Sequence, residues 1–123
     1  MTETEPAEAT ADGDAPATPV QIRSREEYET LLAEEPLVLL EFVTAGCGIC
    51  ASMEPVLGTV ARVAPGAVAT VKAADVPELI EEYTIRSVPT LAVIRDGEEV
   101  ARLDDGFQQA ETLIDLLETH ATD

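Results

Sequence analysis

Along this chain of 123 residues, segments whose apolar residues are spaced as in strands are followed by segments whose apolar residues are spaced as in helices. The clearest run, Leu37–Val43, is apolar at every position except Glu41. A run of strand length without alternation is typical of a central parallel strand that is covered on both faces. Strand-like segments at 20–22 and 67–72 lie on either side of it in the sequence, separated by stretches with helical spacing. Strand, helix, strand, helix, strand is the order of parallel βαβ units.

Four stretches carry the period of an amphipathic helix. Ser24, with Glu27 three residues later, has the arrangement of a capping box, so a helix is expected from there to just before Pro36. Apolar stripes predict three further helices, over 53–61, 76–83 and 110–117. Pro55 lies in the first of these stripes and should kink that helix, because proline removes one donor from the hydrogen-bond ladder.

The pattern changes after the third helix. Residues 89–94 form a strand-like apolar run, Asp96-Gly97 is a strong signal for a two-residue hairpin turn, and 98–103 is expected to return antiparallel. The whole pattern predicts an α/β fold. Its central mixed sheet follows the order β-α-β-α-β-α-β-β-α, with helices on both faces.

The chain divides into an acidic tail and one domain. Residues 1–19 combine Thr, Glu, Ala, Asp, Gly and Pro without periodicity, which is typical of a disordered segment. Its expected role is solubility, in preference to specific docking, because it contains no recognition motif. Residues 20–123 are long enough for one hydrophobic core and too short for two.

The charge of the chain excludes some classes of partner. Acidic residues number 25 against seven basic ones, and the formal net charge is −18. Such a field repels nucleic acid and anionic membrane surfaces. Lys72 is the only lysine, and a shortage of lysine beside an excess of Asp and Glu resembles proteins from organisms that keep molar salt in their cytoplasm. We therefore expect a halophilic source.

The N-terminal segment also bears on location. It has no basic region followed by an apolar segment, as a secretory signal would, and no run approaches the roughly 18 apolar residues of a membrane span. The sequence predicts a cytoplasmic protein. Two cysteines in a reducing compartment are more often catalytic or metal-binding than structural.

Those two cysteines, Cys47 and Cys50, lie where the apolar strand gives way to a helix. Residues three apart on a helix share a face, and a Cα separation of roughly 5 to 5.5 Å lies within the range of a disulfide. The helix N-terminus favours thiolate over thiol, so Cys47 is the expected attacking sulfur. Cys50, one turn further in, is better shielded and is placed to resolve a mixed disulfide formed at Cys47.

Other interpretations of the pair are weaker. Zinc or an iron–sulfur centre takes four protein ligands in a closed site, and beyond the two cysteines the chain offers only His120, so a metal would need a dimer interface. A purely structural disulfide between residues this close closes too small a loop to stabilise much. The surrounding sequence argues against a chance occurrence of the two cysteines at this spacing.

The apolar strand leads into a CxxC motif, and this motif opens a proline-containing helix. Val88-Pro89-Thr90 follows later, before a hairpin and a terminal helix. This combination resembles thioredoxin. The resemblance runs from about Val20 to Thr119. It implies that Cys47 is the nucleophile and Cys50 the resolving cysteine, and that the bond before Pro89 is cis and lies beside the dithiol. The residues it implies for substrate contact are Gly46, Gly48, Ile49, Val88, Pro89 and Gly106.

The resemblance also gives roles to two charged residues. Glu41 stands where thioredoxins have a buried aspartate, and a carboxylate within an apolar strand should have a raised pKa, so Glu41 is a candidate proton acceptor for Cys50. The alternative is a solvated glutamate at a sheet edge. Lys72 falls near the family's buried lysine partner for that acid; the alternative is that the alignment slips, because the following loop is short.

Two positions depart from the family's pattern. Gly46 replaces the usual tryptophan before the first cysteine, and Ile49 replaces the usual proline before the second. The residues between the cysteines help to set the thiol pKa and the reduction potential. Because Ile49 adds no charge, we expect a reductant nearer to thioredoxin than to the strongly oxidising members of the fold.

The sequence therefore predicts a disulfide reductase that reduces protein disulfides by dithiol–disulfide exchange. The resemblance implies disulfide-containing client proteins, re-reduction by a thioredoxin reductase, and no bound cofactor beyond the Cys47–Cys50 disulfide. Two alternatives stay open: an electron donor dedicated to one partner enzyme, and a non-catalytic binding module with this fold. The high charge and low aromatic content favour a monomer.

Overall fold

The computed structural model describes residues 16–121. Most of the segment predicted as a disordered tail, up to residue 15, lies outside the described residues. The helices and strands, in chain order, are β1 (Val20–Ile22), α1 (Arg25–Glu34), β2 (Leu37–Val43), α2 (Gly48–Val63), β3 (Ala67–Lys72), α3 (Pro77–Glu82), β4 (Thr90–Arg95), β5 (Glu98–Leu103) and α4 (Ala110–Ala121).

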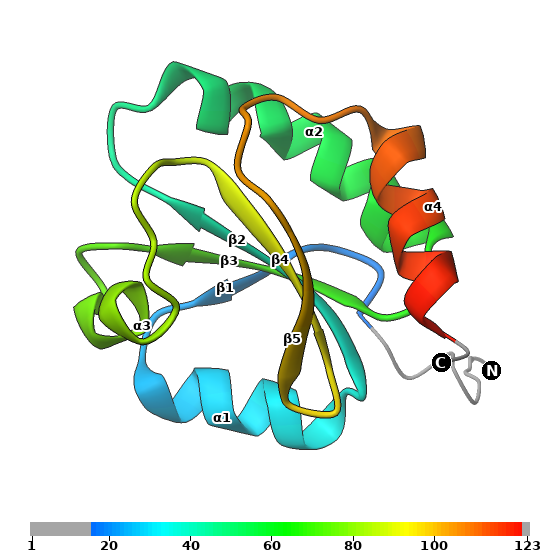
Figure 1. Ribbon diagram of the computed structural model, residues 1–123, viewed down its shortest axis with the longest axis horizontal. Helices are drawn as coiled ribbons and strands as arrows, with labels where there is room; N and C mark the ends of the chain where they lie inside the picture. Colours follow the sequence, from blue (N-terminus) through cyan, green and yellow to red (C-terminus); the bar gives the residue numbers. More distant parts are fainter. Residues whose placement is uncertain (1–15, 122–123) are drawn as a thin grey trace, which may run out of the picture.

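The five strands form one mixed sheet in the order β1-β3-β2-β4-β5. The apolar strand β2 lies in the middle, parallel to β3 and antiparallel to β4. Helices α1 and α3 lie on one side of the sheet, and α2 and α4 lie on the other (Figure 1). The predicted α/β architecture, with a mixed sheet and helices on both faces, is confirmed.

Successive residues of β2 enter two different cores, because side chains of a strand alternate between its faces. Val38, Leu40 and Phe42 pack in the core under α1 and α3. Leu37 and Leu39 pack in the core under α2 and α4. Glu41 follows the same alternation as Leu39, so its side chain points toward α2. The sheet thus places one carboxyl group beneath the helix that carries the cysteines.

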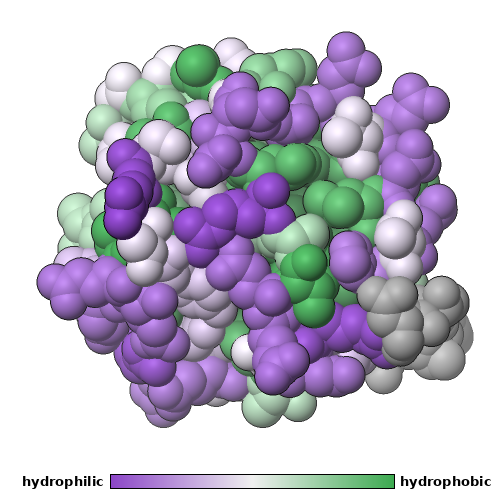
Figure 2. Space-filling model, in the orientation of Figure 1, coloured by the Kyte–Doolittle hydropathy of each residue, from purple (hydrophilic) through white to green (hydrophobic). Residues whose placement is uncertain are grey.

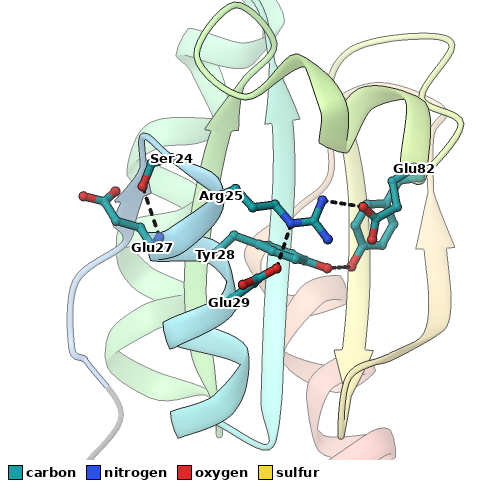
Figure 3. Close-up of polar contacts among 7 residues, drawn as sticks. Ser24, Arg25, Glu27, Tyr28, Glu29 and Glu82 are labelled. Carbon is teal, nitrogen blue, oxygen red and sulfur yellow. Dashed lines mark hydrogen bonds and ion pairs between the residues drawn. The ribbon is translucent and has the colours of Figure 1, made fainter.

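Helix α1 begins at the predicted capping box (Figure 3). Ser24 Oγ accepts a hydrogen bond from the backbone N–H of Glu27 at 3.1 Å. The Glu27 carboxylate accepts from the backbone N–H of Arg23 at 2.7 Å, one residue before the position that a strict capping box would use. Two N-terminal donors are therefore satisfied, and the helix start is fixed close to where the sequence predicts it.

Helices α1 and α3 are tied together by side chains that are far apart in the sequence (Figure 3). Arg25 Nη1 donates to Glu82 at 2.6 Å, and the hydroxyl groups of Tyr28 and Tyr83 are 2.6 Å apart. The tyrosine pair is buried against Phe42, whose ring centroid lies 5.3 Å from that of Tyr83. The buried aromatic contact holds α3 in place, since an exposed ion pair contributes little to stability.

Helix α3 and strand β4 begin slightly later than the pattern predicts. Helix α3 starts at Pro77, because proline is favoured in the first helical turn, and Val76 stays outside as the N-cap residue. Strand β4 starts at Thr90, after a cis peptide bond between Val88 and Pro89. Proline has no N–H to donate to a strand ladder, so Pro89 lies just outside β4.

Candidate active site

Cys47 and Cys50 lie at the start of α2 and are joined by a disulfide, with their Cα atoms 5.2 Å apart. Cys47 is the N-cap residue, and its sulfur accepts a hydrogen bond from the backbone N–H of Cys50 at 3.1 Å. The predicted helix start and the predicted Cα separation are both confirmed. The two sulfurs reach each other because residues three apart at a helix start share a face.

The two cysteines differ in exposure. Cys50 is buried, with 7% of its surface exposed, whereas Cys47 is only partly buried. The first turn of α2 contains no acidic residue, so no side chain there offsets the partial positive charge of the helix N-terminus. Cys47 therefore has both the access and the environment that favour a reactive thiolate.

Glu41 lies in the central strand with 1% of its surface exposed. The alternative of a solvated glutamate at a sheet edge is therefore wrong. Its neighbours in register are Thr70 on β3 and Leu91 on β4, and its Oε2 atom has no hydrogen-bond partner. Burial, followed by the negative charge of Glu54, raises the pKa of Glu41 from its ordinary value of 4.5 to about 7.

A hollow of about 530 Å³ lies between the sheet and the start of α2, and it brings Glu41 and both cysteines to one site. Its other wall residues come from β1 and the residue before it, from β3, from the end of β2 and the loop after it, and from α2. Those that bear on the chemistry are Gln21, Thr70, Lys72, Gly46 and Glu54. The hollow links the buried carboxyl group of Glu41 to the surface beside the disulfide.

Lys72 lies at the rim of this hollow and is exposed, which corrects the expectation of a buried lysine partner for Glu41. It is the last residue of β3, and its neighbour in register is Val43, the last residue of β2. The strands end there, so the side chain reaches solvent. Within residues 16–121, no ion pair within 4.0 Å joins Lys72 to Glu41.

The other predicted site residues lie at the same end of the sheet. Phe42 pairs with Thr90, so Val88 and Pro89 lie level with the point where the chain leaves β2 toward Cys47. Leu91 pairs with Leu103, so the loop that contains Gly106 leaves from this end as well. That loop is fixed to α2 by a hydrogen bond from the Gln108 backbone N–H to Met53 Sδ at 3.5 Å.

Comparison with known proteins decides the family. The family model described as Thioredoxin matches residues 19–119. This chain belongs to the thioredoxin family. A thioredoxin of Chlamydia trachomatis serovar D is 35% identical over 104 residues, which cover 82% of this chain and 98% of the relative. A thioredoxin of Staphylococcus epidermidis is 36% identical over 90 residues, which cover 71% of this chain and 85% of the relative.

Solved structures of thioredoxins share the fold. The N21Q mutant thioredoxin from Halobacterium salinarum NRC-1 superposes with a TM-score of 0.82 at 32% identity, over 91% of this chain and 96% of that one. Schistosoma mansoni thioredoxin superposes with a TM-score of 0.77 at 20% identity, over 86% of this chain and 98% of that one, and shows the fold alone.

Membership of the thioredoxin family and the Cys47–Cys50 disulfide establish the activity. The protein is a thiol–disulfide oxidoreductase that reduces protein disulfides by dithiol–disulfide exchange through these two cysteines. Thioredoxins carry no cofactor, because the redox group is a disulfide of the chain itself. The family implies substrates with disulfides and a reductase as partner. Nothing in the site favours a binding module or a donor dedicated to one enzyme.

Residues 16–121 contain no group of three or more His, Cys, Asp or Glu side chains placed to hold a metal ion. None of the helices within this range is long and apolar enough to cross a membrane.

Glu54 is the residue of this site that sequence reasoning missed. It is exposed on α2, lines the hollow and acts on Glu41 by its charge. Glu54 lies four residues after Cys50, so the two share a face of the helix. That spacing is a usable signal, but it identifies Glu54 only once α2 is known to lie over Glu41.

Proposed function

We propose that Cys47 is the attacking sulfur in the reduced protein and that Cys50 resolves the intermediate. The Cys47 thiolate attacks one sulfur of a client disulfide, and the other client sulfur leaves as a thiolate. The Cys50 thiolate then attacks Cys47 Sγ, which forms the Cys47–Cys50 disulfide and releases the second client thiolate. Two electrons pass from the dithiol to the client. The difference in exposure between the two cysteines is the observation that supports these roles.

Glu41 is the proposed proton acceptor for Cys50. A buried thiol is a poor nucleophile until it loses its proton, and Cys50 is buried. Glu41 lines the same hollow, and its raised pKa of about 7 suits a group that takes and returns a proton near neutral pH. The hollow gives that proton a route to solvent. Lys72 has no part in this scheme, because it is exposed and makes no ion pair with Glu41.

The client is proposed to contact the surface around the disulfide. Gly46, with φ +80°, has open space where a side chain would begin, so a client chain can approach the disulfide closely there. Ile49 and Phe107, which follows Gly106, are 48% and 50% exposed and offer apolar contact. Hydrophobic residues gather over α2 and between β5 and α4 on an otherwise hydrophilic face (Figure 2).

Val88 supplies the proposed backbone contact. It immediately precedes the cis bond to Pro89 and is partly buried, ahead of the first residue of β4. An extended client segment can pair with it by strand addition. Gly48, the exposed first residue of α2, is the remaining proposed contact with the client.

Reduction of insulin disulfides tests the proposed function. With dithiothreitol or a reductase as electron source, the wild-type protein should accelerate insulin reduction well above background. The Cys47→Ser variant should fall to the background rate. If the wild type also stays at background, the scheme of general disulfide reduction is wrong, and the protein is either a binding module or an electron donor dedicated to one enzyme.

We further propose a halophilic, cytoplasmic and monomeric protein that is re-reduced by a thioredoxin reductase. The charge of −18 supports a halophilic origin and a monomeric state, and one structural relative comes from Halobacterium salinarum.

Screening by salt reduces repulsion among exposed carboxylates. The melting temperature should therefore rise between low and multimolar KCl. A melting temperature that stays flat or falls contradicts a halophilic origin.

A further inference from the structure

A second carboxylate faces the hollow in which Glu41 is buried. Glu54 extends from α2, which covers this part of the sheet, and Glu41 extends from β2 beneath it. Glu41 is 1% exposed and its Oε2 atom has no hydrogen-bond partner, whereas Glu54 is exposed. One carboxyl group is thus enclosed with an unpartnered oxygen, and the other lines the same hollow from an exposed position.

The remaining groups around Glu41 do not balance its charge. On β1 and β3, Gln21 donates to Thr70 Oγ1 at 3.1 Å, so these two polar side chains are engaged with each other. On β4 the neighbour in register is the apolar Leu91. Lys72 is the one cation among the residues that line the hollow, and it lies at the exposed end of β3.

The cysteines are the other titratable groups that face the hollow. They form a disulfide and carry no proton in the oxidised state. In this state Glu54 is therefore the charged group on α2 that faces Glu41. Its negative charge opposes ionisation of the buried carboxyl group, as two nearby carboxyl groups do in general.

We propose that Glu54 is a positioning residue for the resolving step: through its charge at the mouth of the hollow, it sets the pH range in which Glu41 can take the proton of Cys50. This inference rests on the proposed role of Glu41 as proton acceptor. Glu54 touches neither the client nor the sulfurs in this scheme, and it acts only through Glu41.

The geometry leads to an effect of salt. Because Glu54 is exposed, its field reaches Glu41 partly through solvent, where the Debye length falls to about 3 Å at 1 M salt. The influence of Glu54 should weaken as salt rises, whereas the effect of burial on Glu41 should not. A residue that only supported the fold would not produce this dependence on salt.

Titration of the Glu41 carboxyl carbon by NMR in the oxidised protein tests the inference. Glu54→Gln should lower the midpoint of Glu41 titration by about half a pH unit at low salt. The difference from wild type should shrink in 2 M KCl. Glu54→Asp, which keeps the charge, should keep a midpoint closer to that of the wild type. The matched control is Glu81→Gln, which removes one exposed carboxylate from α3 on the opposite face of the sheet.

The outcomes separate this inference from the function on which it rests. If wild-type Glu41 titrates near 7 but Glu54→Gln leaves its midpoint unchanged, or if Glu81→Gln lowers it equally, the role of Glu54 is overturned and that of Glu41 stands. If wild-type Glu41 titrates at its ordinary value, the proposed role of Glu41 fails, and the role of Glu54 fails with it.

Discussion

Replacing Cys50 by serine should stop turnover and leave the protein joined to its clients. Cys47 keeps its place at the N-terminus of α2 in this variant, so it still attacks a client disulfide. The mixed disulfide then persists, because a serine hydroxyl does not attack a disulfide sulfur as a thiolate does. We expect insulin reduction to fall to background while covalent adducts accumulate.

Non-reducing electrophoresis and intact mass measurement check this result. The adduct should carry one client chain through Cys47 and should disappear on addition of dithiothreitol. Cys47→Ser is the control and should form no stable adduct, because Cys50 is buried. Failure of Cys50→Ser to form any adduct that depends on Cys47 would reject the scheme. If only the Cys47→Ser variant formed adducts, Cys50 would be the attacking cysteine and Cys47 the resolving one.

Replacing Glu41 by glutamine should stabilise the oxidised protein at alkaline pH. The pKa of Glu41 is raised from 4.5 to about 7 by burial and by Glu54, so the folded state binds this proton more tightly than the unfolded state does. The protonated carboxyl group of Glu41 makes its full contribution to the free energy of unfolding below pH 4.5. This contribution is lost as the pH rises to 7. The ionised Glu41 therefore destabilises the wild type above 7 by about 3 kcal/mol.

Urea unfolding at a series of pH values measures this effect. The free energy of unfolding of Glu41→Gln should exceed that of the wild type by an amount that grows from pH 5 to pH 8, where it reaches about 3 kcal/mol. Glu81→Gln, at an exposed position on α3, should follow the wild type across the range. The same Glu41→Gln protein should resolve mixed disulfides more slowly. A stability difference that does not change with pH would show that Glu41 has an ordinary pKa.

The parts of the fold that the sequence predicts are those fixed by local pattern. The unbroken apolar run of β2 indicates a strand covered on both faces, and β2 is the central strand. The capping box at Ser24 marks the start of α1 because its hydrogen bonds join residues a few positions apart. The cysteine pair is equally local, since the helix that begins after Cys47 alone sets its geometry.

The parts that local pattern does not predict depend on contacts between distant segments or on the resemblance to a family. The exposure of Lys72 follows from its register with the last residue of β2, which the sequence of β3 does not contain. Glu54 is placed over Glu41 only by the packing of α2 on the sheet. The cis bond before Pro89 follows from the resemblance to a family, because only a minority of X–Pro bonds are cis.

The midpoint potential of the Cys47/Cys50 couple tests most directly whether this protein reduces disulfides. Equilibration with glutathione buffers, read out by the mass of the alkylated protein, gives the value. We predict a midpoint near that of thioredoxin, about −270 mV, so that electrons flow from the protein to client disulfides. A midpoint near −120 mV, as in strong oxidants of the same fold, would mean that electrons flow the other way and would contradict the account.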